Sequence, residues 1–209
     1  MPNLLPRGPY HGRMISAVLF DLDGVVRHFD PARAREIERV HGLVPDSLEQ
    51  TLFAEHHLEP VITGRITKQT WLDRVGAELG HPEAVREWGR SPAQADPEVI
   101  SLAAGLRENG IVVAILTNGT DETPDDVAAL GLDRIFDPIL STSQIGHAKP
   151  DRRAFAHALQ RLGLRAEEVF FTDDSAGKLA GAAELGMVTH HYTGVEGLVE
   201  ALRSVAVPV

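Results

Sequence analysis

A short apolar stretch that ends in two aspartates constrains this chain more than any other feature. The run Ala17–Phe20 is too short for a helix, and it leads directly into Asp21 and Asp23, with Gly24 behind them. Apolar runs of this length are typical of strands buried on both faces of a parallel sheet. Ligands gather at the carboxyl ends of such strands. We therefore expect Asp21 at a strand tip and Asp23 in the next loop, where Gly24 permits a sharp turn.

The spacing of the two aspartates points to chemistry more than to stability. Carboxylates on alternate positions repel each other unless a cation or a proton lies between them. A plain Asp-Gly turn remains the alternative for this motif taken alone. The rest of the chain has to supply the partners that distinguish the two interpretations.

Composition narrows the class of protein. The chain has 209 residues, of which 43% are hydrophobic and 24% charged, as expected of a globular protein with a full core. Its formal net charge of −10 argues against nucleic acid as a partner. The absence of cysteine excludes disulfides and thiolate chemistry and suits a reducing cytoplasm. No apolar run has the length of a membrane span, so we expect a cytoplasmic protein without a membrane partner.

The order of the predicted elements divides the chain. Residues 1–13 are rich in proline and glycine, and we expect them to be a disordered N-terminal extension. Residues 28–91 carry helical patterns with no strand between them, which indicates a helical insertion. The predicted helices there cover residues 31–41, 45–59 and 68–79, and a fourth follows Pro82.

Strand and helix alternate from Asp96 onward. Apolar runs predict strands at residues 111–116, 139–140, 169–171 and 187–192, with helices between them that begin at Pro97, near Pro124, at Lys149-Pro150 and at Ala176. This alternation predicts a parallel sheet covered on both faces, with right-handed crossovers. The expected fold is α/β, a Rossmann-like three-layer α/β/α core of residues 14–27 and 92–209 with a small helical domain inserted.

Polar groups follow several of these strands. Thr117 and Asn118 follow one strand, Asp173 and Asp174 follow another, and Lys149 stands between the two pairs. Each has an ordinary alternative: a turn, a helix N-cap, or a solvated lysine. At one sheet edge, together with Asp21, they match the nucleophile, metal ligands and cationic group that phosphoryl transfer requires.

This ordered set resembles the haloacid dehalogenase superfamily, a group of aspartate-nucleophile phosphatases and their relatives. The four motifs of the family correspond to Asp21-Leu22-Asp23-Gly24-Val25, Thr117-Asn118, Lys149-Pro150 and Asp173-Asp174. The resemblance covers nearly all of residues 14–205, including a helical cap between the first motif and the others. The chain is identified as a phosphatase-like member.

The resemblance implies a role for each catalytic position. Asp21 attacks phosphorus and becomes an aspartyl phosphate, and Asp23 protonates the leaving alcohol and then deprotonates the attacking water. Thr117 binds the phosphoryl group, supported by Asn118. Lys149 pairs with the nucleophile and with the phosphate.

The resemblance also implies a Mg²⁺ site. The ligands would be the Asp21 carboxylate, the backbone carbonyl of Asp23 and Asp174, with Asp173 bound directly or through water. Mg²⁺ prefers such oxygen ligands, and Mn²⁺ is a possible substitute.

The predicted activity is hydrolysis of a small phosphorylated metabolite by a monomer or homodimer. The dehalogenases of the family lack an aspartate at the position of Asp23, because a halide leaves without a proton, so Asp23 favours phosphate esters. A phosphomutase is the first alternative. A non-catalytic regulatory protein on the same fold is the second.

Several positions depart from the family pattern or remain open. Lys178 stands where relatives often have Asn or Asp, and it could weaken metal binding, contact substrate phosphate or point into solvent. In the cap, Arg65 is our preferred specificity contact, and Trp71 is expected in the cap core. His56 and His57 should point about 100° apart on a helix, so we expect no joint metal site. The weaker candidates for substrate contacts are His28, His56, His57, Lys68 and Trp71.

Overall fold

A computed structural model describes residues 14–209, and the predicted disorder of residues 1–13 lies outside the described residues. A five-stranded sheet forms its centre, with every neighbouring pair of strands parallel and the order β5-β4-β1-β6-β7. The strands are β1 (Ala17–Phe20), β4 (Val112–Thr117), β5 (Ile139–Ser141), β6 (Val169–Asp173) and β7 (Val188–His191). This confirms the predicted α/β class, with strand bounds within two residues of those expected.

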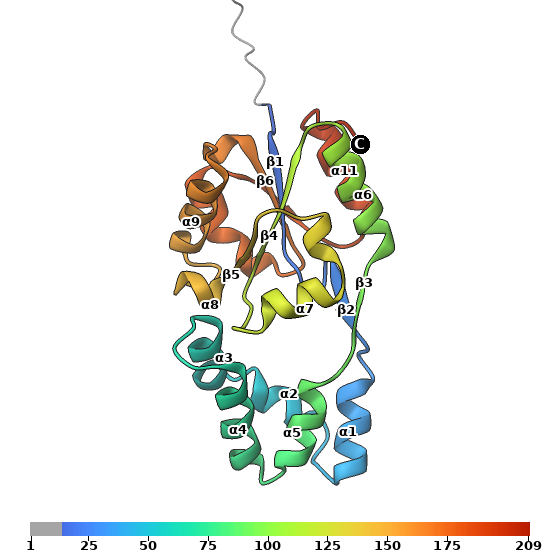
Figure 1. The fold of residues 1–209 in the computed structure, drawn as a ribbon, viewed down its shortest axis with the longest axis vertical. Coiled ribbons are helices and arrows are strands. Elements are labelled where there is room, and N and C mark those ends of the chain that lie inside the picture. Colours follow the sequence, from blue (N-terminus) through green and yellow to red (C-terminus); the bar gives the residue numbers. More distant parts are fainter. Residues whose placement is uncertain (1–13) are drawn as a thin grey trace, which may run out of the picture.

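Helices cover both faces of the sheet (Figure 1). One face packs against α6 (Pro97–Glu108), α7 (Thr123–Ala129) and α11 (Val195–Ser204). The other packs against α8 (Thr142–Ile145), α9 (Arg152–Leu162) and α10 (Ala180–Leu185). Three 3₁₀ turns complete this part of the chain: Leu132–Arg134, Ala166–Glu168 and Ala176–Leu179.

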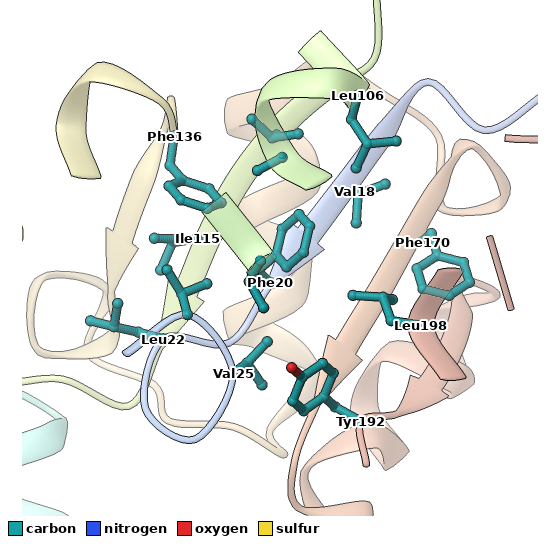
Figure 2. Packing of buried hydrophobic residues seen from close by; sticks show 14 of the residues in the cluster. Val18, Phe20, Leu22, Val25, Leu106, Ile115, Phe136, Phe170, Tyr192 and Leu198 are labelled. Atoms are coloured by element: carbon teal, nitrogen blue, oxygen red, sulfur yellow. The ribbon is translucent and has the colours of Figure 1, made fainter. Parts of the chain in front are cut away.

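Strand β1 shows why the sheet needs helices on both sides. All four of its residues are buried, and they alternate between the two cores. Val18 and Phe20 belong to the first hydrophobic cluster, whereas Ala17 and Leu19 belong to the second. In Figure 2, Phe20 lies beside Phe136, and the two ring centroids are 5.5 Å apart in an edge-to-face contact. A continuous apolar strand is stable only where both faces are covered.

The strand order places the end of β1 at a topological switch point, where the direction of the strand connections reverses. The chain passes from β1 to β4 and β5 on one side of it, then crosses back to β6 and β7 on the other side. The loops that follow β1 and its neighbours therefore diverge, which opens the crevice where open α/β sheets bind ligands.

Five of the six helices between β1 and β4 pack around a core of their own, and we call these five the helical unit. They are α1 (Arg33–His41), α2 (Ser47–Leu52), α3 (Glu55–Ile62), α4 (Lys68–Leu79) and α5 (Pro82–Gly89). Trp71 is buried in this core, as predicted, and its indole N–H donates to the carbonyl oxygen of Leu52 at 3.1 Å. Figure 1 shows the unit at one end of the molecule, with α3 beside α8.

Two strands that the sequence analysis missed lie at either end of the helical unit. β2 (Arg27–Phe29) and β3 (Ala93–Ala95) pair antiparallel, so the chain leaves and re-enters the sheet domain through a single ribbon. Each strand has only three residues, too few for a hydrophobic period to appear. The proposed division at residue 28 falls within β2.

Two predicted helices differ from those observed. Residues 45–59 do not form one helix, because the chain turns at Phe53-Ala54 between α2 and α3. This turn lets Leu52 and Val61 reach the same core, so packing overrides the helical pattern. The helix expected to open at Lys149-Pro150 begins at Arg152, where the Asp151 side chain accepts from the Arg153 amide. Helices α8 and α11 were not predicted.

Among residues 14–209, no helix combines the length and the hydropathy needed to cross a bilayer.

The helical unit is attached to the sheet domain at two further points. The Lys68 ammonium pairs with Glu122 at 2.9 Å, and the Lys68 amide donates to the Asp121 carboxylate at 2.7 Å. At the second point, Gly64 lies so close to Ser143 that a methyl group on Gly64 would overlap the Ser143 carbonyl oxygen.

We expect Gly64→Ala to separate this contact from ordinary backbone strain. Gly80→Ala is a matched control, because Gly80 has φ +71°, Gly64 has φ +72°, and no atom lies near an added Gly80 methyl group. Each variant should lose about 1–3 kcal/mol through its left-handed backbone. Gly64→Ala should lose at least about 1 kcal/mol more through overlap. Urea unfolding measures both, and equal losses would contradict the close contact.

Candidate active site

A buried lysine joins the tips of two neighbouring strands. The Lys149 ammonium lies 2.9 Å from Asp21 Oδ1, directly after β1, and 2.6 Å from Asp173 Oδ2, at the end of β6. None of the three residues is more than 3% exposed. Because a buried charge is costly unless it is paired, each of these groups depends on the other two. The structure thus brings together three residues predicted to share a site.

Asn118 fixes the backbone of Lys149. Its side-chain oxygen accepts from the Lys149 amide at 2.8 Å, and its side-chain nitrogen donates to the Lys149 carbonyl oxygen at 3.0 Å. Asn118 directly follows Thr117, and Thr117 is buried and is the last residue of β4. This two-way bridge ties the loop that carries Lys149 to the end of the neighbouring strand.

A second lysine enters the same cluster. The Lys178 ammonium lies 3.4 Å from Asp21 Oδ2, 3.7 Å from Asp173 Oδ1 and 4.0 Å from Asp174 Oδ1. Its side chain is 32% exposed. Lys178 therefore does not point away into solvent, because its ammonium faces the predicted metal ligands.

Glycine is required where the first loop meets Asp174. Gly24 has φ +87°, and a methyl group there would overlap the Asp174 carboxylate. Any other residue would combine left-handed strain with displacement of this side chain. The Asp-Gly step of the first motif thereby sets the distance between the loops that follow β1 and β6.

The pKa values of the two buried carboxylates, Asp21 and Asp173, are shifted in opposite directions by their surroundings. Burial alone would raise the pKa of Asp21, but the charges of Lys149 and Lys178 and the Leu22 amide outweigh it and hold that pKa below its usual value. Burial raises the pKa of Asp173, and the nearby negative charge of Asp21 adds to the effect despite the opposing charge of Lys149. These surroundings therefore favour the ionised form of Asp21 more strongly than that of Asp173.

Asp23 is paired with a residue that the sequence analysis did not single out. Arg27 Nε lies 2.5 Å from Asp23 Oδ1, and Arg27 Nη2 donates to Asp23 Oδ2 at 3.2 Å. Arg27 is 6% exposed and also reaches Asp126 at 3.5 Å. The Asp23 side chain is 45% exposed. The two aspartates of the first motif therefore have separate environments, one buried and one partly open to solvent.

A cleft of about 580 Å³ lies between the helical unit and the sheet domain, and Lys149 is part of its wall. On one side are Phe53, Glu55, Leu58, Glu59, Ile62 and Thr63, and on the other are Gly146, His147, Ala148, Lys149, Pro150, Asp151 and Arg153. Of the residues described, Arg65 is not in this lining. Its guanidinium pairs instead with Glu59, a lining residue, and donates to Thr63.

The residues described contain two groups whose side chains are placed to hold a metal ion. Asp21, Asp173 and Asp174 form one, with carboxylate oxygens within 4.8 Å of one another. His56, His57 and Glu78 form the other, in the helical unit. The prediction that the two histidines point apart was wrong, since their ring centroids are 4.2 Å apart.

The arrangement around Asp21 is suited to nucleophilic substitution. It provides an ionised carboxylate, two ammonium groups beside it, and further carboxylates that can bind a cation. A partly exposed carboxylate, Asp23, lies two residues away.

Comparison with known proteins agrees with this chemistry. The profile of the haloacid dehalogenase-like hydrolases matches residues 15–186. The chain is 30% identical over 184 residues to Phosphatase MT3486 of Mycobacterium tuberculosis, covering 83% of this chain and 85% of that protein. A glyceraldehyde 3-phosphate phosphatase of Methanopyrus kandleri is 29% identical over 198 residues, covering 84% and 83%. The chain therefore belongs to the haloacid dehalogenase-like hydrolases.

Solved structures show the same fold. A predicted HAD-like family hydrolase from Porphyromonas gingivalis superposes with a TM-score of 0.73 at 21% identity, covering 91% of this chain and 98% of that one. A HAD family enzyme from Bacteroides thetaiotaomicron, in complex with magnesium and inorganic phosphate, gives a TM-score of 0.70 at 23% identity, with 84% and 93% covered.

We expect Asn118→Ala to destabilise the protein, because it leaves the amide and carbonyl of Lys149 without their side-chain partner. The expected loss in free energy of unfolding is about 2 kcal/mol or more. Asn109→Ala is the control, since Asn109 donates to one exposed helix-end carbonyl, that of Gly105, and should cost about 0.5 kcal/mol. Chemical unfolding of both variants tests this. A loss at Asn118 no larger than at Asn109 would contradict the bridging role.

Proposed function

We propose that this chain is a Mg²⁺-dependent phosphomonoester hydrolase that acts on a small phosphorylated metabolite through an aspartyl-phosphate intermediate. The observation that carries the proposal is the Asp21 carboxylate, held at the tip of the central strand 2.9 Å from the Lys149 ammonium. A buried carboxylate kept ionised in this way is a competent nucleophile. Two relatives of this chain are named phosphatases, which supports the proposal.

The proposed reaction has two steps. A carboxylate oxygen of Asp21 attacks phosphorus, the ester P–O bond breaks, and the leaving alcohol takes a proton from Asp23. Asp23 then removes a proton from water, whose oxygen attacks phosphorus, releases inorganic phosphate and restores the Asp21 carboxylate. The Thr117 hydroxyl, supported by Asn118, and the Lys149 ammonium bind the phosphoryl group in both steps.

Asp23 has to change partner to act as the acid. In the structure it accepts two hydrogen bonds from Arg27. Rotation of the Asp23 side chain toward Asp21 would break both bonds, and its 45% exposure leaves room for that movement.

The donor set fits Mg²⁺. Asp21, Asp173 and Asp174 offer only oxygen atoms, within 4.8 Å of one another, and Mg²⁺ takes one or two carboxylates, water and substrate phosphate. These residues, with the backbone carbonyl of Asp23, would hold the ion. Bound there, it would supply positive charge opposite the transferring phosphoryl group. Mn²⁺ has the same ligand preference and should substitute.

The helical unit would act as the cap that selects the substrate. The cleft beside Lys149 joins both parts of the molecule, and its wall includes Glu59 and Arg153. Arg65, our predicted specificity contact, would act there through its pairing with Glu59. A cytoplasmic location and a monomeric or homodimeric state stay predictions.

Asp23 separates this proposal from haloacid hydrolysis, although the chain is 38% identical over 96 residues to (S)-2-haloacid dehalogenase 4A of Burkholderia cepacia. The match covers 46% of this chain and 42% of that enzyme. A phosphomutase would use the same two aspartates, so release of inorganic phosphate, rather than formation of an isomer, is the distinguishing measurement. A regulatory protein would release none.

Chelation should abolish hydrolysis of p-nitrophenyl phosphate, and Mg²⁺ or Mn²⁺ should restore it, because the cluster around Asp21 has three carboxylates for two ammonium groups. Lys178 competes for these carboxylates. Lys178→Asn should therefore bind Mg²⁺ about tenfold more tightly, a difference of about 1.4 kcal/mol. Mg²⁺-dependent thermal shifts and activation curves give the affinity.

Lys178→Arg, which keeps the charge, serves as the control for this comparison and should retain the affinity of the unmodified protein. Full activity after exhaustive chelation would exclude the metal assignment. Unchanged affinity in Lys178→Asn would show that the ammonium group does not compete.

Substitution of Asp21 and of Asp23 should change the kinetics in different ways. Asp21→Asn should lose nearly all turnover with every ester, because an amide cannot form the acyl phosphate. Asp23→Asn should slow the first step by about 10²–10⁴-fold for an alkyl phosphate, whose alkoxide needs a proton. The loss should be much smaller for p-nitrophenyl phosphate, whose leaving group departs unaided.

Because Asp23 also serves the second step, Asp23→Asn should release a burst of nitrophenolate and then turn over slowly. Rapid mixing of both variants with both esters measures this. Equal first-step losses for the two esters, without a burst, would show that Asp23 is not the acid and base.

A further inference from the structure

Two histidines of the helical unit converge on one carboxylate, far from any role in the proposed reaction. His56 and His57 are adjacent residues of α3, and Glu78 lies near the end of α4. The distance to Glu78 Oε2 is 2.8 Å from His57 Nε2 and 3.6 Å from His56 Nε2. The two imidazole rings are tilted by 41°. Both ring nitrogens are therefore directed at the same oxygen atom.

These distances suit a small coordination sphere. A tetrahedral zinc site with bonds of about 2.0–2.1 Å separates its ligand atoms by about 3.3 Å. The two nitrogen-to-oxygen distances lie on either side of that value, and all three ligand atoms are within 4.8 Å of one another. Only small side-chain rotations would be needed to admit an ion between them.

An ion pair with Glu78 explains the position of His57 but not that of His56. His57 is buried and hydrogen-bonded to Glu78, which satisfies a pair on its own. The His56 side chain is 66% exposed and free to turn toward water, yet its ring lies against that of His57. Pairing with Glu78 alone therefore does not account for the position of the His56 ring.

A second histidine–glutamate pair in the same helical unit provides a contrast. His41 Nε2 lies 2.9 Å from Glu87 Oε2, but the other oxygen of Glu87 already accepts from Arg33 at 2.6 Å. A guanidinium occupies the place that a second neutral ligand would need, and its charge opposes a metal ion. The cluster of His56, His57 and Glu78 has two imidazoles instead, and no lysine or arginine is paired with Glu78 among residues 14–209.

We propose that His56, His57 and Glu78 form a binding site for a divalent transition-metal ion, with Zn²⁺ as the preferred occupant. Two imidazoles and one carboxylate are typical zinc ligands, and they differ from the oxygen-only set around Asp21 that suits Mg²⁺. The fourth position would be filled by water. The chain would thus bind different metals in its two parts.

The site would connect helices α3 and α4. Helix α3 also contributes Glu55, Leu58, Glu59 and Ile62 to the cleft beside Lys149. A metal ion that holds α3 against α4 would limit movement of one wall of this cleft. The inference concerns binding alone and does not rest on the proposed activity.

The test measures Zn²⁺ binding to the untagged, metal-free full chain with Mg²⁺ in saturating excess. Competition with a chromophoric chelator gives affinity and stoichiometry, and Co²⁺ absorption reports imidazole ligands. We expect one tightly bound Zn²⁺ per chain and a higher melting temperature. His56→Gln and Glu78→Gln, both at exposed positions, should weaken binding at least about 10-fold and lose the thermal shift.

Two variants make the result specific. His41→Gln removes a histidine from the comparable pair with Glu87 and should bind Zn²⁺ as the unmodified protein does. Asp174→Asn disables the oxygen cluster and should also retain Zn²⁺ binding. The proposal is overturned if His56→Gln and Glu78→Gln bind Zn²⁺ normally, if no chain binds it, or if only Asp174→Asn loses it.

Discussion

The buried ammonium of Lys149 is the interaction on which the rest of the site depends. It lies between Asp21 and Asp173, and a charge without exposure to water requires both partners. Those partners stand at the tips of β1 and β6, which are neighbours only because the chain crosses back past β1 after β5. Asn118, at the end of the strand on the other side of β1, fixes the backbone of the lysine. The charge pairing of Lys149 is therefore possible only with this order of strands in the sheet.

The chain contains few lysines, and each of them lies at a contact that links separate parts of the fold. The sequence contains three lysines among 20 basic residues, and two of them, Lys149 and Lys178, lie in the carboxylate cluster. The third, Lys68, pairs the helical unit with the sheet domain. Arginine has a broad planar guanidinium, whereas lysine delivers a compact charge on a flexible stem. A compact charge fits between carboxylates only a few ångströms apart.

The sequence predicted the sheet and the carboxylate cluster because both have short-range signals. A strand buried on both faces is a continuous apolar run, and the polar residues that follow it must lie at one edge of a parallel sheet. Arg27 and the turn at Ala54 had no such signal, because tertiary contacts decide their placement. The histidine prediction was wrong for a related reason. Helical geometry separates the Cβ directions of His56 and His57, but the flexible side chains bend toward a shared partner on another helix.

The attachment of the helical unit to the sheet domain bears on the substrate selection that we propose. Its ribbon of β2 and β3, the pairing of Lys68 with Glu122, and the contact of Gly64 with Ser143 attach it to the sheet domain at separate points. Between these points α3 faces the loop that carries Lys149, and the cleft there has Glu55 and Glu59 on one wall and the paired Asp151 and Arg153 on the other. In the proposed reaction, a small substrate whose phosphate reaches Lys149 would place its remaining atoms against α3. Under the proposed function, α3 would select the leaving group, and the ends of β1, β4 and β6 would carry out the reaction.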